Sequence, residues 1–337
     1  MSNTWKNTDR DMIQRALQTS NAGATLLQEF VNRTVQQLTL REFGLQAVLE
    51  RKEGVGQAEL INRRVAGTNG GEWVDDTDSA TEENGTYSQE TFTYKSLVTR
   101  GKVTRKLQAT GKSYADVLAL EMSAKAEDFA NQLEFGFIQG DTNGRVSGGS
   151  GGSPNSKICN GFITLIQGVG SLDQVVNVNA AGTTPANNAA LDLSKLDEAI
   201  DLVKGSAQRG DLVIVGSFAG IRAVNDALQA LQRFNDVTEI KAGFRVRTYD
   251  GIPLVVSTEV PNNFAYNASG LITDNNSDGT CLLILNTRYC YIAELTPTTV
   301  MPLSKTSSQF DQFDMYWDGA PVLANTKGAS MLTNIQA

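Results

Sequence analysis

The sequence predicts an α+β protein in which extended segments and one long helix precede a mixed α/β domain. Three observations favour this fold class. Residues 51–112 combine a turn-rich stretch with strand-forming segments, residues 113–140 carry one apolar stripe at helical spacing, and strands alternate with helices over residues 161–294. Such alternation is typical of a compact α/β domain. We therefore expect an extended part followed by a compact part.

The composition is that of an ordinary globular protein. Hydrophobic residues make up 40% of the 337 residues and charged residues 20%, so a core of useful size can form. The longest apolar runs are far shorter than the roughly 20 residues that span a bilayer. The first ten residues are polar, and we expect no secretion signal. The formal net charge of −8 argues against a dedicated nucleic-acid binder, although a protein can still surround DNA without gripping it.

The chain has no histidine, which narrows the chemistry that it can perform. A histidine-free chain cannot form Ser-His-Asp or Cys-His nucleophilic sites or a histidine-containing zinc motif, whereas carboxylate pairs and lysine chemistry stay open. Cys159, Cys281 and Cys290 lack metal-ligand spacing, and we expect them to be reduced thiols. The sequence therefore predicts no enzyme, with no catalytic residue, no cofactor and no metal site.

Residues 1–50 are expected to form an N-terminal arm with helical patches. Apolar residues recur at mixed helical spacing in residues 11–17 and 25–40, among many Gln, Thr and Asn residues. Such a segment is ordered mainly by docking on another surface. An ordinary N-terminal helix of a globular domain is the alternative.

Residues 51–112 are expected to form a long hairpin. Residues 59–65 can be a strand, residues 67–71 are rich in turn formers, and residues 91–103 are rich in the β-branched and aromatic residues that strands prefer. The hairpin has few apolar residues to bury. We therefore expect it to be stabilised mainly by what it contacts.

Two blocks of opposite charge accompany this hairpin. Residues 67–90 hold acidic residues without one Lys or Arg, and residues 95–112 hold basic residues without one acid. Separated blocks favour pairing between copies, with the acidic tip of one against a basic shoulder of another. A solvated acidic loop and a cation site are the alternatives, although the EF-hand pattern is missing. The candidate contact residues are Glu72, Asp75, Asp76, Asp78, Glu82, Glu83, Lys95, Arg100, Lys102, Arg105 and Lys106.

The clearest helix begins after Ser113, which is the expected N-cap, with Asp116 three residues later. Glu121 and Lys125 are spaced as a favourable ion pair, and Gly140 is placed to end the helix. About 26 residues would give a helix roughly 39 Å long. Its apolar stripe consists of Leu118, Met122, Ala126, Phe129, Leu133 and Phe137.

The Gly/Ser-rich residues 141–154 are expected to be a connector. A phosphate-binding loop would need the GxxxxGK[ST] pattern, which is missing. In the domain that follows, Ser194 and Ser217 are expected to cap helices. Gly216 and Gly220 do not complete a dinucleotide-binding fingerprint. Strands are expected at residues 212–215, 252–257, 281–285, 299–303, 310–317, 322–324 and 329–335.

This order of segments resembles that of the HK97-type major capsid proteins of tailed double-stranded DNA bacteriophages. Residues 71–74, with Ser88 and Thr91, are similar to the segment that descends from the family's extended loop, and residues 95–107 are similar to its run into the spine helix. The helix end at 137–141, the strand at 251–257 and the final return at 317–335 resemble the family as well. The resemblance covers nearly the whole chain.

The resemblance implies an HK97-like fold with five parts. These are an N-terminal arm at 1–50, an extended loop (E-loop) at 51–112, a peripheral domain with the spine helix at 113–160, an axial domain at 161–294, and return strands of the peripheral domain at 295–337. It further implies a homo-oligomer of hexamers and pentamers that forms an icosahedral shell around the phage genome in the host cytoplasm. Scaffolding, portal and decoration proteins are the candidate partners, without a membrane and without sequence-specific DNA binding.

Two departures from the family pattern limit what carries over. The arm is short, and we expect no scaffolding segment in it. Some members lock the shell through Lys–Asn isopeptide bonds from a lysine on the extended loop, but residues 66–90 hold no lysine. We therefore expect a non-covalent shell. An encapsulin-like nanocompartment, a soluble α/β nucleotide-binding enzyme and a tail or baseplate protein are the alternative functions.

Overall fold

The computed structural model describes most of the chain from Phe43 to Gln336. Residues 1–42 of the expected arm at 1–50, most of the connector at 141–154, and Glu72, Glu82, Glu83 and Ser113 lie outside the described residues. The described residues are 43–66, 73, 75–76, 78, 84–111, 116–142, 156–167, 174–178, 188–203, 211–230, 237–239, 245–262, 265–266, 272–274, 279–303 and 309–336.

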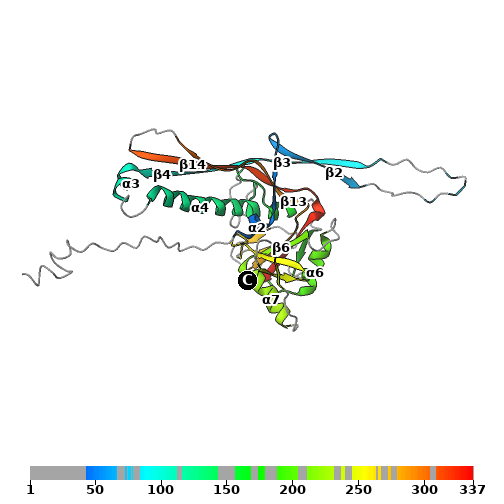
Figure 1. Ribbon diagram of the computed structural model, residues 1–337. Helices are drawn as coiled ribbons and strands as arrows, with labels where there is room; N and C mark the ends of the chain where they lie inside the picture. Colours follow the sequence, from blue (N-terminus) through cyan, green and yellow to red (C-terminus); the bar gives the residue numbers. More distant parts are fainter. Residues whose placement is uncertain are drawn as a thin grey trace, which may run out of the picture.

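A four-stranded sheet and a long helix form the elongated part of the molecule (Figure 1). The strand order is β1-β13-β14-β4, in which β1 runs parallel to β13 and the other pairs are antiparallel. Helix α4 packs along one face of this sheet, where Phe137 meets Trp317 edge to face at 5.3 Å between ring centroids. The elements are β1 (Glu50–Glu53), β4 (Lys95–Thr104), α4 (Val117–Gln139), β13 (Cys290–Pro302) and β14 (Phe310–Leu323).

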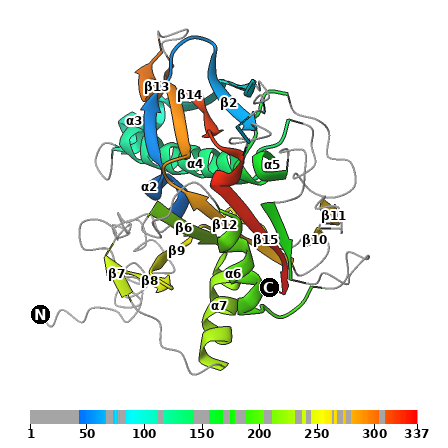
Figure 2. The ribbon, with the colours of Figure 1, turned by 90° about the vertical axis from the view of Figure 1, so that its right-hand side faces the viewer.

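A seven-stranded sheet with helices on both faces forms the compact part. Its order is β5-β15-β12-β6-β9-β8-β7, and Figure 2 shows α6 and α7 side by side against it. Alternate residues of the central strands pack toward these helices or toward α4 and α5. The elements are α5 (Phe162–Gln167), β5 (Val175–Asn177), α6 (Leu193–Leu202), β6 (Leu212–Gly216), α7 (Phe218–Ala230), β7 (Val237–Glu239), β8 (Arg245–Tyr249), β9 (Ile252–Val256), β12 (Gly279–Asn286) and β15 (Ala329–Gln336).

The expected strands at 212–215, 252–257 and 281–285 are confirmed as β6, β9 and β12. Every residue of β12 is buried, because both faces of the sheet are covered, and this explains its continuous apolar run. Asp250 and Gly251 have φ of 48° and 80°, so the Asp-Gly pair makes the tight turn that joins β8 to β9. Smaller elements are α2 (Gly44–Val48), β10 (Ala265–Tyr266), β11 (Ile272–Asp274) and a 3-10 turn η4 (Thr326–Gly328). None of the described helices is long and apolar enough to cross a membrane.

The hairpin is shorter than the sequence suggests. Strand β2 (Ala58–Ala66) pairs antiparallel with β3 (Thr86–Thr93), and the two project from the body (Figure 1). The extended stretch expected from Tyr87 to Val103 is confirmed as strand, but it is divided: the chain leaves the hairpin at Tyr94 and continues as β4 beside β14, so the expectation that all of it belongs to the hairpin is wrong. Both halves have strand-forming residues, and this composition does not tell which strand each half pairs with.

The tail also differs from its expected position. Segments 310–317 and 322–324 are essentially one strand, β14, and β13 runs without interruption across the expected domain boundary at 294. Strand β15 lies in the seven-stranded sheet between β5 and β12. The expectation that all of residues 295–337 return to the sheet of the long helix is therefore wrong for β15. The remaining domain limits stay a prediction.

Two helix caps are carried by aspartates rather than by the expected serines. The Asp116 carboxylate accepts hydrogen bonds from the amides of Leu118 and Ala119 at the start of α4, so this residue, not Ser113, is the N-cap of the 23-residue helix. Asp192 caps α6 in place of Ser194, whose hydroxyl donates to it. The prediction for Ser217 is confirmed, because its hydroxyl accepts a hydrogen bond from the Gly220 amide.

Within α4, Lys125 Nζ lies 3.7 Å from Asp128 in an i,i+3 ion pair. The predicted partner was Glu121, and no ion pair of the described residues joins Glu121 to Lys125. Both acids are within reach of a lysine on a helix surface. The pair lies on the surface and contributes little to stability.

Candidate inter-subunit surfaces

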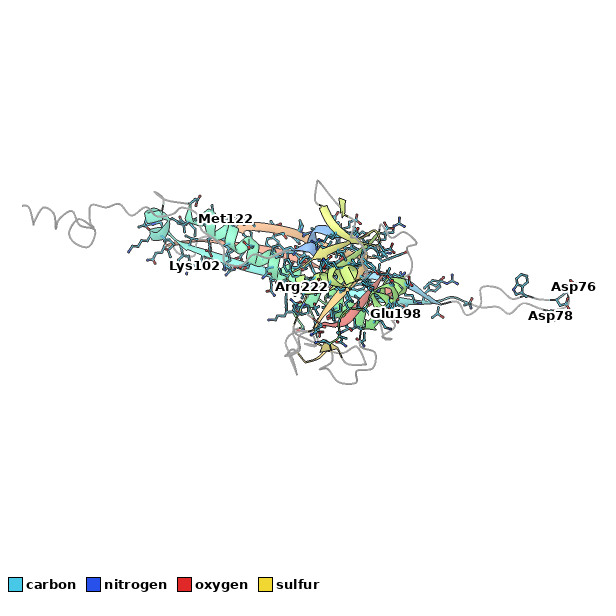
Figure 3. All side chains as sticks on the ribbon, turned by 90° about the horizontal axis from the view of Figure 1, so that it is seen from below. Asp76, Asp78, Lys102, Met122, Glu198 and Arg222 are labelled. Atoms are coloured by element: carbon cyan, nitrogen blue, oxygen red, sulfur yellow. The ribbon has the colours of Figure 1, made fainter. Side chains whose placement is uncertain are left out.

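The acidic residues that the structure describes lie at the far end of the hairpin. Asp75, Asp76 and Asp78 are exposed, and Figure 3 shows Asp76 and Asp78 at one extreme of the molecule. Asp78 donates its amide to the Asp75 carbonyl at 3.0 Å, which closes a local turn. Trp73 beside them is fully exposed. The tip therefore presents carboxylates and one indole ring to its surroundings.

The basic residues lie elsewhere, and the structure does not bring the two blocks together. Lys95, Arg100 and Lys102 are on β4, while Arg105 and Lys106 begin helix α3 (Arg105–Gly111). Figure 3 shows Lys102 on the opposite side of the body from Asp76. The prediction of a basic shoulder on the hairpin itself is therefore wrong, since β4 leaves the hairpin and joins β14.

Three of the five basic residues have partners within the chain. Arg100 holds Asp314 through two hydrogen bonds of 2.7 and 2.8 Å, and this contact lowers the pKa of Asp314. Lys102 Nζ lies 3.7 Å from the centroid of the Phe310 ring. Lys95 Nζ donates to the Ser156 carbonyl at 2.7 Å. Arg105 and Lys106 are exposed on α3.

The four-stranded sheet has one face that α4 does not cover. Phe313, Met315 and Trp317 of β14 are buried toward α4, so strand alternation directs their neighbours Asp314 and Tyr316 to the other face. Two apolar residues of the neighbouring strands lie opposite these residues and therefore on the same face. Met301 of β13 is paired with Asp314, and Val98 of β4 is paired with Tyr316. Their exposed fractions are 50% and 57%. We call this surface, formed by Val98, Arg100, Lys102, Met301, Phe310, Asp314 and Tyr316, the outer face.

A buried carboxylate joins the elements near the N-terminal end of the described chain. Glu134 of α4 is fully buried. It accepts hydrogen bonds from the amides of Leu45 and Gln46 at 2.9 and 3.2 Å, and from the Ser257 hydroxyl at 2.8 Å. Burial raises the pKa of Glu134, and these hydrogen bonds oppose that shift. One side chain thus connects α2, α4 and the end of β9.

Two further clusters hold the base of the hairpin against the body, and both involve residues that the sequence did not single out. Arg63 contacts β14 and Glu59 contacts β13. The sequence offered only a weak signal, since charged residues at alternate positions of a strand normally indicate a solvated face. Glu134 carried a similarly weak signal, as one acid beside an apolar helical stripe.

Among the described residues, no group of three or more His, Cys, Asp or Glu side chains could hold a metal ion. All three cysteines are buried, and burial raises the pKa of Cys159 and of Cys290 to about 12, far above that of a reactive thiol. A cavity between β4, α4 and Cys159 holds about 60 Å³, space for a few water molecules only.

Comparison with solved structures places this fold among shell proteins. The capsid chain of an empty GTA particle is 18% identical with a TM-score of 0.63, covering 95% of this chain and 99% of that one. The SrpI encapsulin of Synechococcus elongatus PCC 7942 is 14% identical with a TM-score of 0.62, covering 94% and 95%. A chain of Mycobacterium phage Bobi is 12% identical with a TM-score of 0.62, covering 94% and 98%. At these identities the likeness shows the fold, which is HK97-like.

Sequence comparison gives the family. No curated protein sequence matches the chain. A model of the SU10 major capsid protein family, however, matches residues 17–336 and so covers both sheets, the long helix and the hairpin. This chain belongs to the SU10 major capsid protein family and is a shell-forming subunit of a virion capsid.

Proposed function

We propose that the subunits join head to tail, with the hairpin tip of one copy on the outer face and α3 of the next, and so build hexamers and pentamers of an icosahedral shell around double-stranded DNA. The observation that carries this proposal is the separation of opposite charges to opposite ends of an elongated subunit (Figure 3). Contact between unlike ends of identical subunits is heterologous, and such contacts close into rings when the rotation permits. This supports rings of five and six copies.

The chemistry of the two surfaces supports the same pairing. Asp75, Asp76 and Asp78 would meet Arg105 and Lys106, whose side chains are exposed. The exposed Trp73 ring would find apolar contacts on the outer face at Val98 and at other residues of that face. Ion pairs at the rim of an interface mainly set orientation and the rate of association, whereas buried aromatic residues contribute most of the affinity.

The proposed shell needs no catalysis, no sequence-specific DNA binding and no covalent bonds between its subunits. We propose no enzymatic activity and no sequence-specific contact with DNA, since the net charge is −8 and the chain has no histidine. We also propose assembly in the host cytoplasm, with scaffolding, portal and decoration proteins as further partners. A non-covalent shell is supported by Lys52 and Lys95, which flank the hairpin. Lys52 lies over the Tyr291 ring at 4.0 Å, and Lys95 binds the Ser156 carbonyl.

An encapsulin-like compartment is the second candidate, because the SrpI encapsulin matches as well as the capsid chains do. Both would form closed shells, and they differ in content. Particles isolated from an infected host would contain DNA under our proposal. Particles that contain an enzyme bound to the inner wall, and no DNA, would favour the compartment.

Charge reversal at the two surfaces tests the head-to-tail contact. The variant Asp75→Lys/Asp76→Lys is expected to fold but to form at least tenfold fewer rings or shells in negative-stain images. The variant Arg105→Glu/Lys106→Glu is expected to do the same, because like charges would then face each other. Combining all four changes restores opposite charges and should restore assembly.

The conservative variant Asp75→Glu/Asp76→Glu keeps both charges and serves as the control, with assembly as in the wild type. The ellipticity and the thermal unfolding midpoint report whether each variant folds. Normal assembly of the Asp75→Lys/Asp76→Lys variant would contradict the proposed contact. The contact would also be contradicted if the variant with all four changes folded but still failed to assemble.

A further inference from the structure

The base of the hairpin rests on the outer side of β13 and β14. Strand alternation points Phe92 toward the body, where it is buried with Tyr291, Ala293 and Val322, and Ile61 packs beside them. The opposite face of the hairpin is exposed, as are the described residues from Asn84 to Gln89 other than the half-buried Gly85. The hairpin therefore contacts the body over a short length around Phe92.

Arg63 fixes the outer end of this contact. Its guanidinium donates to the carbonyl oxygens of Leu323 and Ala324, the latter at 2.8 Å, at the end of β14. It also pairs with Glu90 on the neighbouring strand of the hairpin. The Arg63 side chain is 15% exposed, and burial lowers its pKa. A planar guanidinium that binds two successive carbonyls and a carboxylate restricts rotation as well as distance.

Glu59 fixes the inner end. Its carboxylate accepts hydrogen bonds from the hydroxyl of Tyr94 at 2.9 Å and from the hydroxyl of Tyr291 at 3.3 Å. Burial and the Glu59 carboxylate raise the pKa of both tyrosines to about 12. Tyr94 also covers Gly54, where an added Cβ would lie 2.4 Å from the phenol oxygen. The turn from the hairpin into β4 is therefore held in one position.

We propose that Arg63 and Glu59 are positioning residues that fix the direction of the hairpin before any contact with a second subunit. Two anchors on one face of a strand, four residues apart, prevent both tilting and twisting of the hairpin on the sheet. Asp75 lies twelve positions after Arg63, a reach of up to about 40 Å in extended chain. A rotation of about 10° at the base would move the tip by roughly 7 Å over that reach, more than the tolerance of a specific ion pair.

That a fixed hairpin direction helps subunits to assemble rests on the proposed head-to-tail contact. The direction itself can be measured in single subunits, without that contact. The three native thiols are buried, so spin labels attached to Asp78→Cys and Glu198→Cys report on these two positions alone. Pulsed dipolar spectroscopy on labelled subunits, diluted into excess unlabelled subunit, gives the distribution of distances between tip and body. One narrow distribution is expected for the otherwise wild-type chain.

In this background Arg63→Ala is expected to broaden the distribution at least twofold. Arg64→Ala is the matched control, because it removes the same charge from the next residue, whose side chain is exposed on the other face, and it should leave the width unchanged. Arg63→Lys keeps the charge but cannot bind two carbonyls in the same plane, so an intermediate width is expected. A general loss of packing would not produce this graded order.

Glu59→Ala tests the second anchor and keeps the proposal testable should Arg63→Ala fail to fold. It is expected to broaden the distribution, while Asn62→Ala, exposed on the same strand, should not. Unchanged widths for Arg63→Ala and Glu59→Ala would overturn the inference. If only the head-to-tail contact were wrong, the width of the distance distribution in each variant would still be as expected here. The two proposals can therefore fail separately.

Discussion

Glu134 is a carboxyl group in the protein interior whose hydrogen bonds hold three elements together. Burial raises its pKa above the ordinary value of 4.5 because the charged form loses its hydration, and the donors from Leu45, Gln46 and Ser257 offset only part of this cost. The folded protein therefore binds a proton at Glu134 more readily than the unfolded chain does.

This difference predicts how stability depends on pH. The contribution of Glu134 to the free energy of unfolding is fully present below pH 4.5 and is lost as the pH rises through the raised pKa. The loss is about 1.4 kcal/mol for each unit by which the pKa is raised. Glu134→Gln is neutral at every pH and has the shape of the protonated acid, so it lacks this loss.

Urea unfolding of dilute subunits from pH 4 to pH 8 measures the effect. The stability of the wild type relative to Glu134→Gln should fall as the pH rises, and the other carboxyl groups cancel in this difference. Gln132→Ala, which changes an exposed and uncharged side chain of the same helix, is the control, and its stability relative to the wild type should not change with pH. A flat difference for Glu134→Gln would mean that the pKa of Glu134 is not raised.

At the scale of elements, the hairpin is an appendage whose outer part adds little to the stability of the subunit. Its described outer residues are exposed, while its base buries Phe92 and anchors Arg63. Replacing residues 67–85 by a two-residue Asn-Gly turn should therefore shift the thermal unfolding midpoint by no more than a few degrees. The same variant should form no rings or shells in negative-stain images. Normal shells from the shortened chain would exclude the tip from assembly.

Elements with a strong local signal could be predicted from the sequence. The apolar run 281–285 could only be a buried strand or a short buried helix, and Ser217 followed a buried strand directly, where a cap was required. The long helix was clear from its stripe, although Ser113 and Asp116 were both good caps and spacing alone could not choose between them.

Features that depend on partners distant in sequence could not be predicted. The break at Tyr94 arises because β4 pairs with β14 more than 200 residues later, and the place of β15 depends on β5 and β12. Arg63 and Glu59 looked like solvated charges because their acceptors and donors, on β13 and β14, are equally distant. Asp75, Asp76 and Asp78 are exposed far along the hairpin, whereas Lys95, Arg100 and Lys102 lie on β4, which pairs with β14 and not with the hairpin.

At the scale of the whole molecule, the shell should be held together without covalent bonds. Lys52 and Lys95 flank the hairpin in sequence, and each has a partner on the body: Lys52 lies over the Tyr291 ring, and Lys95 donates to the Ser156 carbonyl. Mature particles boiled in denaturant and run on a gel should therefore give one band at the 36.3 kDa of the subunit. A ladder of covalent multimers would contradict this expectation.

The chain makes two short crossings between the two sheets, from β12 to β13 and again from β14 to β15. Each crossing is short, and Glu134 adds a third connection near α2. A joint with this many links resists bending, so the body should keep one shape in every position of a closed shell. Five-fold and six-fold neighbourhoods nevertheless differ in curvature. That difference must then be absorbed at the contacts between neighbouring subunits, because neither the body nor the base of the hairpin at Arg63 and Glu59 gives way.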